Sequence, residues 1–126
     1  MICGKITAGG EVIVEGQVRV KLNDNFVITE DDARNFSFRG PASFEPEISF
    51  IDLSEYEANK AFGVFKGMLD VGEVREIIAE VADVSVSGPM RCNMVSIGDN
   101  GEGGYMVDVG LCSAGQYDVK LPSLIA

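Results

Sequence analysis

Histidine and tryptophan are absent from this chain of 126 residues, and tyrosine occurs only three times. Without histidine, the chain cannot form a Ser-His-Asp or Cys-His catalytic arrangement, a histidine-bearing zinc site or an imidazole acid–base step. The scarcity of large aromatic side chains also leaves little material for the platforms of a sugar-binding cleft. The composition therefore excludes the histidine-dependent enzyme classes and disfavours a glycosidase.

Basic residues are scarce as well. Lysine and arginine together number 10 against 20 aspartates and glutamates, so the net charge is −10 and the sequence pI is about 4.3. A protein that grips nucleic acid needs a positive surface against the phosphates. We therefore expect no specific binding of nucleic acid.

Cysteine is limited to Cys3, Cys92 and Cys112, an odd number at wide spacing. No CxxC pair or dense disulfide framework is present, which indicates a reducing compartment and thiols that serve as small buried hydrophobes. No apolar run approaches the ~18–20 residues of a membrane span, and the N-terminus lacks the run of about seven apolar residues that a signal peptide needs. We expect a soluble intracellular product with no membrane partner.

The residues that are present suffice for one hydrophobic core. Hydrophobic residues make up 46% of the chain and charged residues 24%, which is ordinary for a globular protein. At this length roughly 65–70% of the surface of the unfolded chain can be buried on folding. No repeat, linker or low-complexity segment divides the sequence, so we expect a single domain over residues 1–126.

Apolar and polar residues alternate in the first half of the chain, which predicts strands. These strands are expected over residues 11–22, 26–28, 36–39 and 44–51. Asn23, Asp24 and Asn25 favour a turn, so the first two strands are expected to form a hairpin. The polar run from Thr29 to Asn35 is expected to be a solvated loop. Gly40-Pro41 interrupts the alternation, because proline cannot donate to a central ladder.

The spacing of apolar residues changes to a helical period after Ser54. Ser54 and Glu57 form a capping box, in which the hydroxyl accepts from the Glu57 amide while the Glu57 carboxylate reaches back. Apolar residues then recur at positions 58, 61, 62, 65, 68 and 69, which predicts an amphipathic helix of about 14 residues. Gly63 and Gly67 weaken this helix by roughly 1 kcal/mol each relative to alanine, so packing must stabilise it.

The stretch after this helix fits two structures. A second helix over residues 72–81 is favoured by the local pattern, with Val74, Ile77, Ile78 and Val81 on one face. The strand alternative places Val74, Ile78 and residues 82, 84 and 86 on one face, although two glutamates interrupt it. Further strands are expected over residues 83–87, 90–97, 104–112 and 117–121, with a turn at Gly88-Pro89 and a flexible loop over 99–104.

Short strands with glycine-containing turns predict an α+β fold that is mainly β. We expect an antiparallel β-sandwich or barrel-like sheet with one helix packed on it, or two helices if residues 72–81 are helical.

Few residues suggest chemistry. The loop over residues 99–104 offers oxygen ligands but lacks the pattern of an EF-hand or a phosphate-binding loop, so a hairpin turn is the preferred interpretation. Glu45 and Glu47 lie on one face of a predicted strand about 6.5–7 Å apart at Cα, a spacing compatible with paired catalytic carboxylates but ordinary for a solvated strand face. We therefore predict no catalytic site, no metal site and no cofactor.

The apolar ends of the chain indicate assembly. Met1-Ile2-Cys3 and the tail Leu121–Ala126 would be poorly solvated if they were free. We expect them to be covered by neighbouring copies.

The order of the predicted elements resembles that of phage tail tube proteins. In that family an alternating hairpin leads through a long loop to a strand, one helix and long antiparallel strands. The matching segments are residues 16–28 for the hairpin, 29–41 for the loop, 45–52 for the strand, 54–69 for the helix and 74–113 for the closing strands. The family has a long strand where the favoured pattern predicts a helix over residues 72–81.

The resemblance implies a non-enzymatic virion structural protein. In this family subunits form hexameric rings that stack into a tube, and an electronegative lumen conducts DNA without binding it. Glu45, Glu47 and Asp108, on polar strand faces, are then candidate lumen acids. The candidate inter-ring loop carries Glu30, Asp31, Asp32, Arg34 and Arg39. The implied location is the virion tail after assembly in the host cytoplasm, with sheath, baseplate or terminator proteins as further partners.

Three other interpretations stay open. The chain could be another tail or head component, such as a connector, a tail-tip ring or a decoration protein. It could be a small intracellular α+β binding module. An enzyme without histidine would have to use Cys92 or carboxylates such as Glu45.

Overall fold

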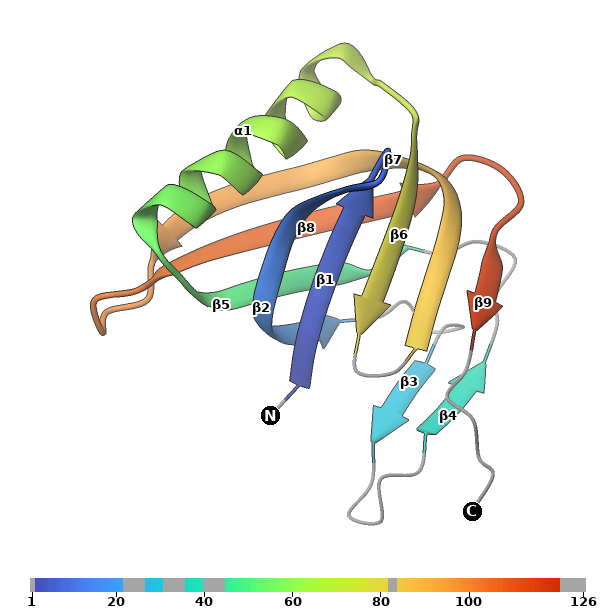
Figure 1. Cartoon of the computed structure of the whole chain (residues 1–126), viewed down its shortest axis with the longest axis horizontal. Helices are drawn as coiled ribbons and strands as arrows, with labels where there is room; N and C mark the ends of the chain where they lie inside the picture. The colour runs from blue at the N-terminus through green and yellow to red at the C-terminus, as the bar shows by residue number, and fades with distance from the viewer. Residues whose placement is uncertain (1, 22–26, 31–35, 40–44, 82–83, 121–126) are drawn as a thin grey trace.

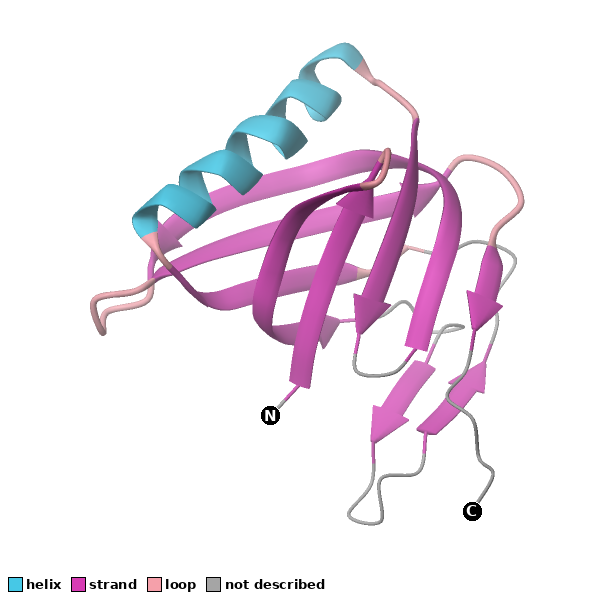
Figure 2. Ribbon diagram, in the orientation of Figure 1, coloured by secondary structure: helices cyan, strands magenta, loops and turns pink. Residues whose placement is uncertain are grey.

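A computed structural model of the chain describes residues 2–21, 27–30, 36–39, 45–81 and 84–120. The elements are β1 (Ile2–Ala8), β2 (Glu11–Lys21), β3 (Val27–Glu30), β4 (Phe36–Arg39), β5 (Glu47–Leu53), α1 (Glu55–Val71), β6 (Arg75–Val81), β7 (Val84–Asp99), β8 (Tyr105–Ser113) and β9 (Asp118–Lys120). The predicted fold class is confirmed: the described chain is mainly β, with one helix packed on the strands (Figures 1 and 2).

Six strands close into an antiparallel barrel. The sheet order is β6-β1-β2-β5-β8-β7-β9, and β6 also pairs with β7, so the six strands form a ring and β9 is an extra strand on β7. Strands β2 and β7 are long enough to pair with one neighbour along their first part and with another neighbour along their second part, and this change of partner lets the sheet close. β2 pairs with β1 and then with β5, and β7 pairs with β6 and then with β8. Closure removes the exposed edges that a small open sheet would present.

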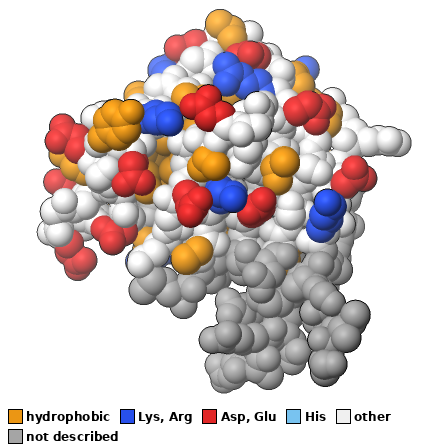
Figure 3. Space-filling view, viewed as in Figure 1, with side chains coloured by type: hydrophobic (Ala, Val, Ile, Leu, Met, Phe, Trp, Pro, Cys, Tyr) orange, Lys and Arg blue, Asp and Glu red, His pale blue; other side chains and the backbone are white. Residues whose placement is uncertain are grey.

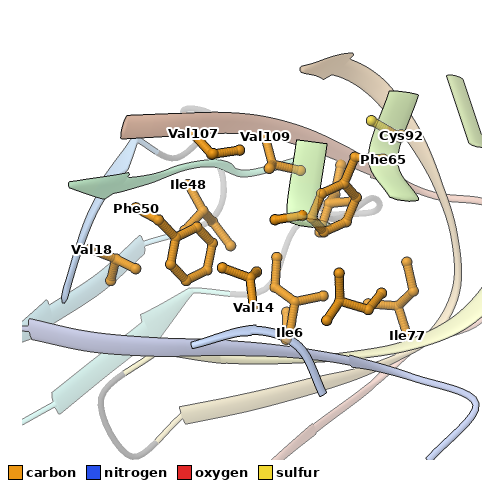
Figure 4. Packing of buried hydrophobic residues seen from close by; sticks show 14 of the residues in the cluster. Ile6, Val14, Val18, Ile48, Phe50, Phe65, Ile77, Cys92, Val107 and Val109 are labelled. Atoms are coloured by element: carbon orange, nitrogen blue, oxygen red, sulfur yellow. The ribbon is translucent and has the colours of Figure 1, made fainter. Parts of the chain in front are cut away.

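The core fills the inside of this barrel (Figure 4). Side chains alternate along each strand, so every second residue of β5 and β8 points inward. Ile48, Phe50, Val107 and Val109 are among these inward residues, and each is at most 1% exposed. No polar or charged residue is buried among the residues whose side chains are described.

Helix α1 begins and ends where the local sequence dictates. The Ser54 hydroxyl accepts from the Glu57 amide at 3.2 Å, and the Glu57 carboxylate accepts from the Ser54 amide, which confirms the predicted capping box. Gly72 ends the helix in a left-handed conformation with φ of 64°. The apolar face packs along β7 and β8 and reaches β2 (Figure 1). Its buried residues are Ala58, Ala61, Phe65 and Met68.

The helix predicted over residues 72–81 was wrong, because Arg75–Val81 form strand β6. β6 lies between β1 and β7 and pairs with both. Its inward residues are Ile77, Ala79 and Val81, so Ile78 faces outward and is 40% exposed. The strand alternative had grouped Ile78 with residues 84 and 86, which are buried. Two ladders of backbone hydrogen bonds outweigh the local helical pattern. A strand here removes the departure from the element order of phage tail tube proteins.

The turn predicted at Gly88-Pro89 was also wrong. β7 continues through both residues, and Pro89 lies opposite Glu76 of β6. Pro89 lies close to the point where β7 exchanges its β6 partner for β8, at Met90. A proline, which cannot donate to a ladder, is tolerated where the pairing of a strand is interrupted, and the Pro89 carbonyl accepts from the Ala114 amide at 2.8 Å.

The hairpin predicted between residues 11–22 and 26–28 was wrong as well. β2 forms its hairpin with β1, a strand that the sequence patterns missed, through Gly9 and Gly10 with φ of 60° and 83°. Positive φ at both positions is typical of tight hairpin turns. β3 pairs with β4 in a separate two-stranded sheet. The predicted turn over residues 23–25, the Gly40-Pro41 break and the tail over residues 121–126 lie outside the described residues.

Candidate assembly surfaces

Two of the predicted lumen acids lie on one surface. Glu47 on β5 and Asp108 on β8 belong to neighbouring strands, with Ser49 directly opposite Asp108. The residues between them in sequence point into the core, so both acids face away from it. Glu47 is exposed, and Asp108 is half-buried and accepts from the Ser96 hydroxyl at 3.3 Å. We call the outward surface of β2, β5, β8 and the second half of β7 the β5–β8 face.

The third predicted acid, Glu45, lies just before β5 at the end of the same surface. The Cys112 thiol lies 3.8 Å from the Glu45 carboxylate, and Arg91 is opposite Cys112 across the β7–β8 ladder. Burial raises the pKa of Cys112, the Glu45 charge and hydrogen bond raise it further, and Arg91 opposes the shift. The alternation of polar and apolar residues therefore places the three acids on one outer surface of the barrel.

This surface also carries cations that the sequence reasoning did not assign to it. Arg19 lies opposite Ser49 in the β2–β5 register, and Arg91 lies opposite Cys112, whose thiol contacts Glu45. The signal was available in the sequence, since Arg19 occupies a polar position in the alternation of residues 11–22. The β5–β8 face is thus mixed in charge.

Further acids gather at another place, where the β7–β8 turn and the start of α1 meet (Figures 1 and 3). We call this region the acidic end. Its exposed acids are Asp52, Glu55, Glu57, Asp99 and Glu102. Asp52 comes from the end of β5, and its carboxylate would lie 2.8 Å from a Cβ added at Gly104.

The loop predicted over residues 99–104 is a hydrogen-bonded turn. The Asn100 side chain donates to the Ile51 carbonyl at 3.0 Å and accepts from the amides of Glu102 and Gly104. The Asp99 carboxylate accepts from the Gly101 amide at 2.6 Å. Backbone amides therefore occupy oxygens that a cation would need. Among the residues that the structure describes, no group of three or more acidic or cysteine ligands could hold a metal ion.

The residues predicted for the inter-ring loop fall around the separate hairpin of β3 and β4. Glu30 is the last residue of β3 and Arg39 the last residue of β4. Asp31, Asp32 and Arg34 lie outside the described residues. The loop expected over residues 29–35 is thus in part a strand.

Cys92 is poorly placed to act as a nucleophile. It is only 5% exposed, its thiol donates to the Met94 carbonyl at 3.3 Å, and burial raises its pKa. Cysteine chemistry requires an accessible thiolate. The environment of Cys92 favours the predicted role of a small buried hydrophobe, whereas the same prediction was wrong for Cys3, which is exposed.

The hollows described on the surface are shallow and lie on the outside of β1, β2 and β6. One of about 180 Å³ is lined by Cys3, Gly4, Lys5, Glu15 and Glu80, and its Lys5 and Glu80 form an ion pair at 3.7 Å. Another, of about 250 Å³, lies near the Gly9-Gly10 turn. Within the described ranges, no helix has the length and apolar character needed to cross a membrane.

These features define a fold class, a closed antiparallel barrel with one covering helix. Its charged side chains lie on outer surfaces, among them the β5–β8 face and the acidic end. Solved structures share this fold. A chain in the tail of an empty gene transfer agent (GTA) particle, determined with C6 symmetry, is 18% identical with a TM-score of 0.57, over 95% of this chain and 96% of that chain. A chain in the virion of a native GTA particle is 16% identical with a TM-score of 0.54, over 94% and 95%. No protein-family model and no curated protein matches the chain.

Proposed function

We propose that this protein is a non-enzymatic virion structural protein, the subunit of a tail tube in which hexameric rings stack around a lumen that conducts DNA. The observation that carries the proposal is the similarity, over nearly the full length of both chains, to a chain in a C6-symmetric particle tail. The element order of phage tail tube proteins points the same way, since β6 supplies the strand that the order requires.

The chemistry of the described surface supports a structural role. Among the described residues, the Cys92 thiol is buried, and Asp99 and Asn100 accept hydrogen bonds from backbone amides of their own turn. The barrel offers broad outer surfaces, which are suited to contacts with neighbouring copies. Virion proteins such as a sheath, a baseplate or a tube terminator are further proposed partners.

The net charge of −10 suits a conduit for DNA. Negative surface repels phosphates, so a genome passes without adhering. Glu45, Glu47 and Asp108 remain our candidates for lumen acids, although Arg19 and Arg91 lie on the same face. The acidic end is the competing location.

Imaging of the purified protein tests the proposal. We expect rings with six-fold symmetry, and stacks of such rings, in negative-stain micrographs, together with masses in multiples of six subunits by light scattering. Isolated rings that never stack would indicate a connector, a tail-tip ring or a decoration protein instead. A monomer at all concentrations would contradict the proposal and favour a small binding module.

A charge reversal tests the lumen acids. Tubes of the double variant Glu47→Lys, Asp108→Lys should retain DNA that is protected from nuclease, because the positive charges would lie inside. The matched control, Glu55→Lys with Glu102→Lys, makes the same change of charge at the acidic end and should hold only DNA that nuclease digests. The reverse result would place the acidic end in the lumen and reject the three candidates.

A further inference from the structure

One asparagine in this sequence precedes a glycine. The chain has asparagine at positions 23, 25, 35, 59, 93 and 100, and of these only Asn100 is followed by a glycine, Gly101. The side-chain amide of an asparagine can be attacked by the backbone nitrogen of the next residue. Glycine permits this attack best, because it has no side chain in the way and its backbone is the least restricted. Asn100-Gly101 is therefore the dipeptide of this sequence that is most open to spontaneous deamidation.

Deamidation at this dipeptide needs only water as a co-reactant. The Gly101 nitrogen loses its proton and bonds to Cγ of Asn100, the bond from Cγ to Nδ2 breaks, and the side-chain nitrogen leaves as ammonia. Water then opens the cyclic imide at either of its carbonyls, which gives an aspartate or an isoaspartate at this position. The reaction therefore requires a backbone nitrogen that can give up its proton and a side-chain amide whose atoms can move.

The folded β7–β8 turn holds the side-chain amide of Asn100 in place. Its Nδ2 donates to the Ile51 carbonyl of β5 at 3.0 Å, and its Oδ1 accepts from the amides of Glu102 and Gly104 at 2.8 and 3.0 Å. Attack by the Gly101 nitrogen turns the planar Cγ into a tetrahedral carbon and moves both Oδ1 and Nδ2. The three hydrogen bonds must break for this to happen, so the attached turn opposes the reaction.

The attacking nitrogen is engaged as well. The Gly101 amide donates to the Asp99 carboxylate at 2.6 Å, so a nitrogen that lost its proton here would stand directly beside a negative charge. Close packing restricts the side chain further. A Cβ built on Gly104, which is buried, would lie 2.5 Å from Nδ2 of Asn100 and 2.8 Å from Oδ1 of Asp52. The amide and the Asp52 carboxylate thus both lie against the bare Cα of Gly104.

The product of deamidation does not fit the place of the amide. An ionised carboxylate accepts hydrogen bonds but donates none. It can still accept from Glu102 and Gly104, but it has no N–H for the Ile51 carbonyl, and it brings a negative charge close to that carbonyl oxygen and to the Asp52 carboxylate. An isoaspartate also lengthens the backbone of the turn. The product therefore loses the link between the β7–β8 turn and β5.

We propose that Asn100 is a deamidation site that the folded turn protects and that opening of the turn exposes. Each time the β7–β8 turn separates from β5, Asn100-Gly101 reacts as it does in an unfolded chain. The product cannot restore the bond to Ile51, so the turn stays detached and the acidic end, beside which it lies (Figure 1), keeps one more negative charge. This inference does not depend on the proposed role in a tail.

Peptide mass spectrometry of the full chain measures the reaction. The folded chain and the chain unfolded in guanidinium chloride are incubated side by side at mildly alkaline pH, and the mass increase at each asparagine is followed with time. We expect Asn100 to react first in the unfolded chain and at least about ten-fold more slowly in the folded chain, because only the open fraction of the turn reacts. Equal rates in the two states, or an earlier reaction at Asn59 or Asn93 in the unfolded chain, would overturn the proposal.

Gly104→Ala opens the turn without altering the reacting dipeptide. The added methyl group takes the space of the Asn100 amide, so the folded variant should deamidate several-fold faster than the unmodified chain. Gly98→Ala is the matched control, because a Cβ there meets nothing within 4 Å, and it should react at the unmodified rate. An unchanged rate in Gly104→Ala that is folded by circular dichroism would contradict protection by the turn. If this variant does not fold, the comparison in guanidinium chloride still decides.

Asn100→Asp tests the consequence of the modification. It should lower the midpoint of urea unfolding, because the half-buried Ile51 carbonyl loses its donor. Asn59→Asp makes the same change of charge at an exposed position of α1 and should leave the midpoint nearly unchanged. Equal midpoints for Asn100→Asp and the unmodified chain would reject the detachment of the turn by deamidation.

Discussion

Single glycines decide where this chain turns and where it continues straight. Gly9 and Gly10 supply the positive φ angles of the β1–β2 turn. Gly88, beside a proline, does not turn the chain but lets another segment approach it. A Cβ at Gly88 would lie 2.8 Å from the Gln116 carbonyl oxygen and 3.0 Å from the Tyr117 Cα, and the φ of 154° is one that side chains rarely adopt.

Gly88→Ala should therefore destabilise the fold by about 1–3 kcal/mol, because backbone atoms must move and the conformation is strained. The comparison variant is Gly98→Ala on the same strand, where a Cβ meets nothing within 4 Å, and we expect a change within about 0.5 kcal/mol. Urea denaturation of both variants measures the difference. Equal stabilities would contradict the close approach.

The thiol of Cys112 reports on the surroundings of Glu45. Because the negative charge of Glu45 raises the pKa of Cys112, Glu45→Gln should lower that pKa and increase the thiolate fraction at a given pH. Iodoacetamide should then alkylate Cys112 several-fold faster near pH 8. Glu47→Gln, on the same face, should leave the rate unchanged, and the same effect from both variants would argue against a specific contact.

At the scale of elements, α1 is fixed locally and the strands are not. The helix has its own start signal, an apolar face with helical spacing and a glycine at its end, all within 19 consecutive residues, Ser54 to Gly72. Its length was underestimated at about 14 residues against 17 because the C-terminal turn extends to Gly72. In contrast, the β6 segment has a helix-compatible pattern and becomes a strand only between β1 and β7.

Ser54→Ala should cost about 1 kcal/mol of unfolding free energy, because the Glu57 amide loses its acceptor and the capping box is broken. Asn59→Ala, at an exposed position on the same helix, is the control and should be neutral or slightly stabilising, since alanine favours helix. Chemical denaturation followed by circular dichroism measures both. A neutral Ser54→Ala would show that tertiary packing alone sets the start of α1.

At the scale of the whole molecule, the net charge opposes assembly of copies and apolar contacts favour it. Each copy carries a net charge of −10, so neighbouring copies in an assembly repel each other. Apolar contacts between copies must outweigh that repulsion. The mixed charge of the β5–β8 face reduces this repulsion locally, because Arg19 and Asp108 both lie opposite Ser49 in their ladders.

Salt should consequently favour assembly. The repulsion between charges extends over about 30 Å at 0.01 M ionic strength but only about 10 Å at 0.1 M. Repulsion between copies therefore weakens as salt is added. We expect sedimentation to show a larger fraction of rings and tubes at 0.1–0.3 M salt than at 0.01 M. Dissociation on adding salt would indicate that ion pairs between copies hold the assembly instead.

The sequence by itself determined α1 with its cap, the alternation of β8 that carries Val107 and Val109 inward, the strands at β4, β5 and β9, and the outward position of Glu47 and Asp108. These features depend on neighbours a few residues away. Only the tertiary structure decided that residues 75–81 form a strand, that β7 passes straight through Gly88, and that β1 rather than β3 is the hairpin partner of β2. Each of these outcomes depends on ladder hydrogen bonds or close approaches between segments distant in sequence, so no local pattern contains them. The same reason explains why the position of Arg19 near Asp108 was not predicted. The alternation of a strand shows which face a residue takes, whereas only the register shows which residues lie beside it.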